Sequence, residues 1–193
     1  MKRRDLLAAL CVLPAVPSWA TPTRYAIGPG GARIRFDFNL MGGIQSGTVP
    51  LANADLRIDP ERLSASTADV TADVRRARTG LFFATEAMKS EGVLDAQNHP
   101  TASFRSTRVI LGSGGRISDG GALEGDLTLR GVTRPVRFEA AIYRPRGTAP
   151  TDLSRLSVLL KGSVDRFAFG ASGYPDLVGP NVGIDIQVDI AAA

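Results

Sequence analysis

The sequence predicts an all-β protein with one short helix, in which eight antiparallel strands close into a barrel. Apolar and polar residues alternate with a period of two in about eight stretches, and a single stretch has helical spacing. The 21 glycines and 12 prolines are enough to separate many short elements. Strands with one apolar face can bury that face and remove their exposed edges by closing into a barrel. A two-sheet sandwich is the alternative that fits the same pattern.

The alternation is clearest in 33–40, where Ile34, Phe36, Phe38 and Leu40 share one face. This pattern is typical of antiparallel strands with one dry face and one wet face. The predicted strands, in order, are 33–40, 47–58, 66–74, 101–111, 123–130, 136–143, 156–165 and 182–190.

One helix is predicted over 78–90, between the third and fourth strands. Thr79 is a suitable N-cap residue, and Gly92 is expected to end the helix. The glycine-rich run 28–31 lacks the spacing of a phosphate-binding loop, so we interpret it as a turn. Gly162 is expected to mark a bulge or bend in its strand.

Residues 1–20 have the three parts of a secretory signal peptide: a basic start, an apolar stretch (6–16) too short to span a bilayer, and a cleavage motif at 18–20. We therefore expect a signal peptide over 1–20, a mature barrel domain over 21–193, and a periplasmic location. A membrane anchor is the alternative. The Arg3-Arg4 pair is compatible with twin-arginine export as well as with the general secretory route.

Cleavage would change the composition. It would remove three basic residues and one acidic residue, so the net charge would fall from +4 to +2. It would also remove Cys11 and Trp19, the only Cys and Trp, which excludes a disulfide scaffold and iron–sulfur sites. His99 is the single histidine, which excludes a multi-histidine zinc site. No basic cluster is interleaved with aromatic residues, so we expect no nucleic-acid partner.

The apolar face of the strands is the candidate binding site. Turned inward, it would form a dry interior for a prenyl or acyl chain, which gains about 0.8 kcal/mol for each methylene removed from water. The alternative is that these side chains only pack on one another. Phe83 and Met88 of the helical segment could close one end, because methionine adapts to variable ligands. The candidate ligand-binding residues are Phe36, Phe38, Leu40, Phe83, Met88, Phe104, Leu127, Leu129, Phe138, Val158, Phe169 and Ile186.

Polar candidates are few. Arg166 could hold a phosphate or carboxylate head group by a bidentate contact, or it could pair with Asp165. The basic run 75–78 could attract anionic groups or remain solvated. The lone His99 lies beside a proline in a turn, and the sequence contains no Gly-x-Ser-x-Gly motif. We therefore expect no catalytic residues and no metal site.

Several segments resemble the YceI-like family of exported lipid-binding proteins. The most specific is 123–136 (LEGDLTLRGVTRPV), which is similar to the family's G-x-L-T-x-x-G-V-T-x-P-V hairpin. The supporting segments are 25–27 with the strand 34–38, 66–80, 90–106 and 161–170. The resemblance covers about residues 22–190. It implies a lipocalin-like barrel with a helix over one end and a pore that holds a long isoprenoid or another amphiphilic chain.

The chain departs from the family pattern at four places. The family usually has a histidine near position 39, an R-D-x-x-L start to its helix, a phenylalanine pair and a tyrosine before a proline. Here these places hold Asn39, the segment 83–88, Val93-Leu94 and His99. The predicted fold is unchanged by these departures.

Pattern and resemblance together predict an exported, non-enzymatic, lipocalin-like barrel that carries or sequesters a hydrophobic small molecule. A polyisoprenoid is the first choice of ligand, and a quinone-like or fatty-acyl amphiphile is the second. We expect no other cofactor and no membrane span in the mature chain, and a homodimer is compatible with the sequence. Two other functions stay open: an envelope protein with a filled core that acts through a protein partner, and an enzyme that acts on a lipid head group.

Overall fold

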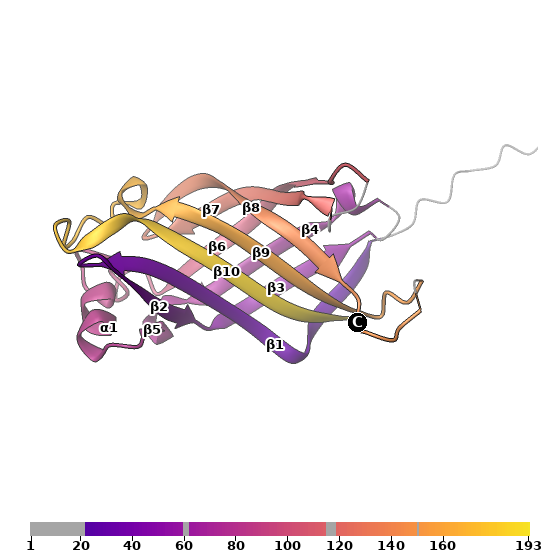
Figure 1. The fold of residues 1–193 in the computed structure, drawn as a ribbon, viewed down its shortest axis with the longest axis horizontal. Helices are drawn as coiled ribbons and strands as arrows, with labels where there is room; N and C mark the ends of the chain where they lie inside the picture. The colour runs from indigo at the N-terminus through magenta and orange to yellow at the C-terminus, as the bar shows by residue number, and fades with distance from the viewer. Residues whose placement is uncertain (1–21, 60–61, 115–118, 150) are drawn as a thin grey trace, which may run out of the picture.

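The computed structural model describes residues 22–59, 62–114, 119–149 and 151–193. These residues form one elongated antiparallel barrel with α1 at one end (Figure 1). The predicted signal peptide, 1–20, lies outside the described residues and stays a prediction. In the described part of the chain, no helix has the length and hydropathy needed to cross a membrane.

The strands and helical elements follow one another in a simple order along the chain. The strands are β1 (Thr23–Leu40), β2 (Gly43–Val49), β3 (Leu51–Ile58), β4 (Thr67–Asp73), β5 (Arg78–Thr79), β6 (Thr101–Ile110), β7 (Gly121–Leu129), β8 (Val132–Tyr143), β9 (Arg155–Asp165) and β10 (Val178–Ala192). The helical elements are α1 (Phe82–Lys89) and the short 3₁₀ turns η1 (Leu63–Ala65), η2 (Val74–Arg76) and η4 (Arg166–Phe169).

Ten strands make an eight-stranded wall because two wall positions are interrupted. β2 and β3 lie end to end beside β1 and are separated by Pro50, which has no N–H to give to the sheet. β4 and β5 are separated by the 3₁₀ turn η2. The two interruptions adjoin each other, because the Asp73 amide donates to the Pro50 carbonyl at 2.9 Å. β1 also pairs with β10, which closes the sheet and excludes a sandwich. The predicted eight-stranded barrel with one helix is confirmed.

Cross-strand register separates an apolar inner face from a charged outer face. Phe36 pairs with Ile184 on β10, and the next pair along, Arg35 with Asp185, points to the opposite side. The alternation predicted over 33–40 and 182–190 is therefore the alternation between the interior and the exterior of the barrel.

The helix is shorter than predicted, because α1 spans only Phe82–Lys89. Thr79 is therefore not its N-cap, and Gly92 lies beyond its end. Thr79 instead belongs to β5, where its backbone pairs with Gly47, and its hydroxyl donates to the Leu81 carbonyl at 2.7 Å. Strand pairing has overridden the capping preference of threonine.

The structure contradicts the predicted turn at 28–31 and the predicted bulge at Gly162. The run 28–31 does not connect separate elements; it lies within β1, as an irregularity across which the pairing with β10 shifts, between Ile27 and Ala32. Gly162 does not mark a bulge, because β9 pairs with β10 in unbroken register and places Gly162 opposite Ile184.

The most tightly packed cluster lies at the end of the barrel away from α1. It consists of Tyr25, Ile58, Leu156 and Ile190, each less than 9% exposed. The Tyr25 hydroxyl donates to the Leu153 carbonyl at 2.7 Å, which ties β1 to the segment before β9. Burial raises the pKa of the Tyr25 phenol. We call this end the closed end of the barrel.

Candidate lipid-binding cavity

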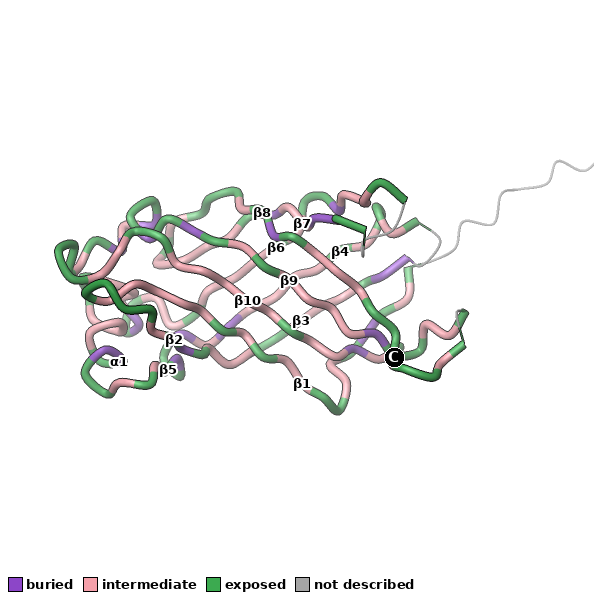
Figure 2. Tube along the Cα trace, viewed as in Figure 1, coloured by how far each residue is buried: buried purple, intermediate pink, exposed green. Residues whose placement is uncertain are grey.

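The barrel encloses a cavity of about 460 Å³. This volume lies within the range of about 300–1,000 Å³ that is typical of small-molecule sites. All eight wall positions and α1 contribute to the lining, which is made almost entirely of aliphatic and aromatic side chains. Many inward side chains are consequently half-buried rather than fully buried, and Figure 2 shows intermediate burial along most of the wall. The interior is a container and not a filled core.

The structure brings most of the predicted binding residues together around this cavity. The predicted residues that line it are Phe36, Phe38, Leu40, Phe83, Met88, Phe104, Leu127, Leu129, Phe138, Val158 and Ile186. Phe169 is the exception: it is 2% exposed within η4 and does not line the cavity. The 3₁₀ turn η4 ends the inward–outward alternation of β9, so the Phe169 ring does not face the lumen.

Sequence reasoning missed the part of the lining that comes from β3 and β4. Leu56 of β3 and Ala68, Val70 and Ala72 of β4 all face the cavity. In β4 these apolar residues alternate with Asp69, Thr71 and Asp73, but the hydrophobic pattern is weak because the apolar side chains are small.

Three inward phenylalanine rings lie against glycines of neighbouring strands. Phe36 covers Gly47, Phe104 covers Gly125 and Phe138 covers Gly162. A Cβ at position 125 would come within 2.5 Å of the Phe104 ring, and one at position 162 within 2.7 Å of the Phe138 ring. Because these glycines have no side chain, each ring can lie close to the wall and leave the centre of the barrel free.

The cavity reaches solvent at the α1 end. Phe83, Tyr174 and Leu177 line it there and are 64%, 46% and 45% exposed. The amide of Met41, in the turn between β1 and β2, donates to the Leu177 carbonyl at 2.8 Å and joins the turn to the segment before β10. We call this the open end, and it lies opposite the closed end (Figure 1).

Arg166 does not have the free guanidinium that a head-group site needs. The residue is 4% exposed, and four of its N–H groups donate to backbone carbonyls at 2.5–3.0 Å. The acceptors are Gly179, Ala171, Gly173 and Val178. Burial lowers the pKa of the guanidinium from its ordinary value, and the nearby Asp165 charge opposes this effect. Arg166 lines the cavity, but these bonds commit its guanidinium to segment 171–179, which includes the start of β10.

The family assignment follows from a direct comparison. The model of the YceI-like domain matches residues 25–191, which is nearly the whole described chain. The chain belongs to the YceI-like family. A UPF0312 protein of Vibrio cholerae is 27% identical to it over 184 residues, which cover 92% of this chain and 95% of the relative.

Solved structures show the same YceI-like fold. BcnA of Burkholderia cenocepacia superposes with a TM-score of 0.72 at 16% identity, covering 85% of this chain and 99% of BcnA. A polyisoprenoid-binding domain from Saccharophagus degradans gives a TM-score of 0.61 at 11% identity, covering 90% of this chain and 100% of that domain. The YceI protein of Campylobacter jejuni gives 0.59 at 16% identity, covering 100% and 99% of the two chains.

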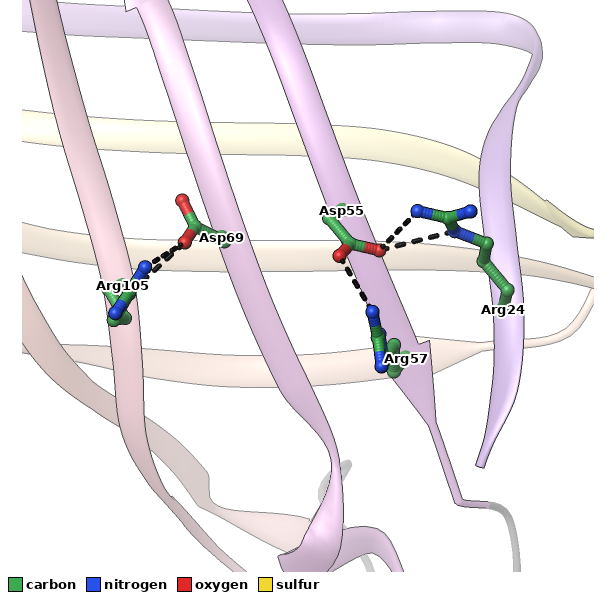
Figure 3. Close-up of polar contacts among 5 residues, drawn as sticks. All are labelled: Arg24, Asp55, Arg57, Asp69 and Arg105. Carbon is green, nitrogen blue, oxygen red and sulfur yellow. Dashed lines mark hydrogen bonds and ion pairs between the residues drawn. The ribbon is translucent and has the colours of Figure 1, made fainter. Parts of the chain in front are cut away.

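The outer face of this YceI-like barrel carries paired charges. Arg105 of β6 donates to Asp69 of β4 at 2.9 Å, and Arg24 and Arg57 each donate to Asp55 at 3.3 Å (Figure 3). The hydrogen bond from Arg57 is the largest of the effects that lower the pKa of Asp55, and Arg24 adds to it. Exposed pairs of this kind contribute little stability individually, but they keep the outer wall polar.

A second set of charges runs from β6 across β7 to β8. Glu124 of β7 accepts from Arg108 of β6 and from Arg137 of β8, both at 2.7 Å. These hydrogen bonds, Arg108 first, lower the pKa of Glu124. Lys161 and Asp185 continue the pattern between β9 and β10 at 3.4 Å. The charged exterior and the apolar lumen thus follow from the same two-residue period.

Proposed function

We propose that this YceI-like protein is exported to the periplasm and carries an amphiphile whose long apolar chain, a polyisoprenoid or a close equivalent, occupies the barrel. The observation that carries the proposal is the apolar cavity of about 460 Å³, closed at one end by the Tyr25 cluster and open at the α1 end. The polyisoprenoid-binding domain of Saccharophagus degradans, which has the same fold, supports this choice of ligand.

The chemistry of such binding is simple. A chain inside the lumen gains about 0.8 kcal/mol for each methylene removed from water, so affinity does not depend on a dedicated polar contact. The closed end is packed, so the head group of the ligand would lie at the open end. A quinone-like or fatty-acyl amphiphile satisfies the same geometry and is the second choice. The proposed role is binding and delivery.

The competing idea of a filled core that acts only through a protein partner fits the geometry less well. It requires the inward aromatic rings to meet across the lumen. Phe36 stacks on Phe38 at 6.1 Å, and Phe104 meets Phe138 edge to face at 5.6 Å, yet all four rings still line an open cavity.

Native mass spectrometry of the protein purified from the periplasm of its own host tests the proposal. We expect a chain that begins at Thr21 and a non-covalent adduct with the mass of a polyisoprenoid or related amphiphile, lost on denaturation. A protein that is never found with an adduct, and that fails to bind a polyprenol on titration, would refute the carrier function. A chain that retains residues 1–20 in the cytoplasm would refute export alone.

A further inference from the structure

Large apolar side chains are exposed together at the open end. Met41, Ile44, Phe82 and Phe83 are 78%, 69%, 83% and 64% exposed. Met41 and Ile44 belong to the β1–β2 hairpin, and the two phenylalanines begin α1. We call these four residues the apolar rim. Phe83 alone of the four lines the cavity, so binding inside the barrel does not explain the other three.

Met41 has a backbone conformation that is unfavourable for methionine. Met41 and Gly42 have φ values of 52° and 86°, so the turn between β1 and β2 uses two left-handed residues in succession. Hairpin turns of this kind favour Asn, Asp or Gly, because a side chain such as methionine is strained there. The exposed methionine gains no buried packing in return. Local strain without a packing benefit is characteristic of functional positions.

The start of α1 also departs from the usual residue preference for a helix N-cap. Its N-cap position is Leu81, which offers no side-chain acceptor, where Ser, Thr, Asp or Asn is usual. The two exposed phenylalanines follow at once. The segment is nevertheless held in place, because the Thr79 amide donates to the Thr85 hydroxyl at 2.9 Å and the Thr85 amide donates to the Leu81 carbonyl at 3.0 Å. The rings are therefore presented to solvent on a fixed support.

A group of arginines without acidic partners lies on the adjoining outer face. Arg33, Arg76 and Arg78 line a shallow groove of about 300 Å³ beside β1 and β2. Within the part of the chain that the structure describes, none of these three guanidinium groups forms an ion pair. Arg24 and Arg105, elsewhere on the wall, are each paired with an aspartate. Arg78 stands four residues before Phe82 and pairs with Thr48, which is four residues after Ile44, so the arginines of this segment adjoin the rim. Arg33 is farther away, eight residues before Met41 along β1.

We propose that the open end docks onto a membrane surface that contains anionic lipids. The apolar rim enters the boundary between head groups and acyl chains, and Arg76 and Arg78, which adjoin it, face the lipid phosphates. An apolar patch flanked by arginines is the combination that a peripheral membrane site requires, since each basic residue near an anionic surface strengthens binding about fivefold. The inference rests on the proposed function for its purpose: docking would align the opening of the cavity with the bilayer, so that an apolar chain could move between them without crossing water.

Vesicle flotation with the purified full barrel tests this proposal. Vesicles of phosphatidylcholine alone are compared with vesicles of an equal mixture of phosphatidylcholine and phosphatidylglycerol. The apolar variant is Met41→Asn combined with Phe82→Ser, and neither residue lines the cavity. The charge variant is Arg76→Gln combined with Arg78→Gln. The matched controls lie at the closed end: Tyr143→Ser, a 50% exposed aromatic residue, and Arg144→Gln combined with Arg146→Gln, two exposed arginines.

We expect the wild-type protein and both controls to float with the anionic vesicles. The charge variant should lose at least about tenfold in binding to them, by the fivefold effect of each arginine. The apolar variant should lose binding to both kinds of vesicle, while unfolding at the wild-type temperature or above it, because Asn accepts a left-handed φ. Equal losses in the rim variants and the controls would overturn the proposal, as would wild-type flotation by the rim variants.

Two further results distinguish membrane docking from self-association and from ligand binding. If the apolar rim covers a second copy of the chain, gel filtration will show a wild-type dimer that the apolar variant converts to a monomer, and neither form will float. That result would overturn membrane docking. The ligand content of each variant is measured in parallel by native mass spectrometry. Rim variants that keep their adduct but do not float confirm docking as a function distinct from binding, whereas adduct-free wild-type protein that still floats would refute only the carrier function.

Discussion

The ring of Phe138 on β8 covers Gly162 on β9, and a Cβ at position 162 would lie within 2.7 Å of the ring carbon Cδ1. It would also lie 2.9 Å from the Arg137 carbonyl oxygen, which belongs to the backbone and cannot move away easily. The pair fixes the position of one aromatic ring against the wall. The open volume of the barrel therefore depends on a residue that has no side chain.

Gly162→Ala should push the Phe138 ring into the lumen. We expect a loss of about 1–3 kcal/mol in the free energy of unfolding, the usual result of overpacking, together with lower ligand occupancy. Urea unfolding and native mass spectrometry measure the two effects. Gly183→Ala on β10 is the matched control, because its Cβ would meet its nearest neighbour, on Asp37, at an ordinary 3.8 Å. Equal destabilisation of both variants would contradict a specific role for the contact between Gly162 and Phe138.

Phe38→Asp should weaken binding of the apolar chain. An unpaired carboxyl group facing the lumen would have to be desolvated by the ligand, so we expect the Kd of a polyprenol to rise by at least about tenfold. Asn39→Asp, on the neighbouring position of the same strand, adds the same charge where the side chain can still accept from the Gly42 amide. This control should bind normally. A folded Phe38→Asp protein with wild-type affinity would show that the face assignment is wrong.

Arg166→Lys should destabilise the protein without changing which head groups it accepts. Lysine cannot reproduce the planar set of four bonds to backbone carbonyls, and we expect a loss of about 2 kcal/mol or more on chemical denaturation. Arg134→Lys is the control, since Arg134 is exposed and makes a single bond, to the Ala168 carbonyl at 3.3 Å. Selective loss of anionic amphiphiles by a stable Arg166→Lys protein would restore the head-group role.

Tyr25→Phe should weaken the closed end by about 1 kcal/mol at neutral pH, because the hydroxyl bond to Leu153 is lost. The pKa of Tyr25 is raised above 10.0 in the folded protein, so the unfolded chain releases this proton first. Its contribution is complete below pH 10.0 and decreases as the pH rises through the folded pKa. The stability difference between wild type and variant should therefore narrow at alkaline pH.

Urea unfolding at a series of pH values measures this difference. Tyr143→Phe is the control, because Tyr143 is 50% exposed and its replacement should change the free energy of unfolding by less than about 0.5 kcal/mol. A stability difference between Tyr25→Phe and wild type that grows with pH would contradict the assigned burial of the phenol.

The architecture was predictable from the sequence because a two-residue period is a local property. Phe36 and Phe38 reveal their shared face by their spacing alone, and the wall that they predict is the wall observed. The features that sequence reasoning missed depend on partners far along the chain. Gly162 is explained only by Phe138 on another strand, and Tyr25 by a carbonyl 128 positions away.

The structure also limits two sequence predictions, for a related reason. Thr79 satisfies the local rule for an N-cap, but pairing of its backbone with β2 moved the start of the helix to Phe82. Arg166 has the chemistry of a phosphate ligand, yet four of its N–H groups donate to backbone carbonyls of segment 171–179, which includes the start of β10. A side chain's chemical capacity can be read from its identity, whereas its availability depends on the tertiary structure.

The pairing of β1 with β10 also has a consequence for the order of assembly. These are the first and last strands of the barrel, so the wall cannot close until the C-terminal strand has been synthesised. Contacts between such distant segments make folding slow, and until they form, β1 and β9 present unpaired edges along their whole length. During that interval the apolar surface is accessible from the side. A long ligand present at that time could be enclosed by the arrival of β10 and would not need to be threaded through the finished opening.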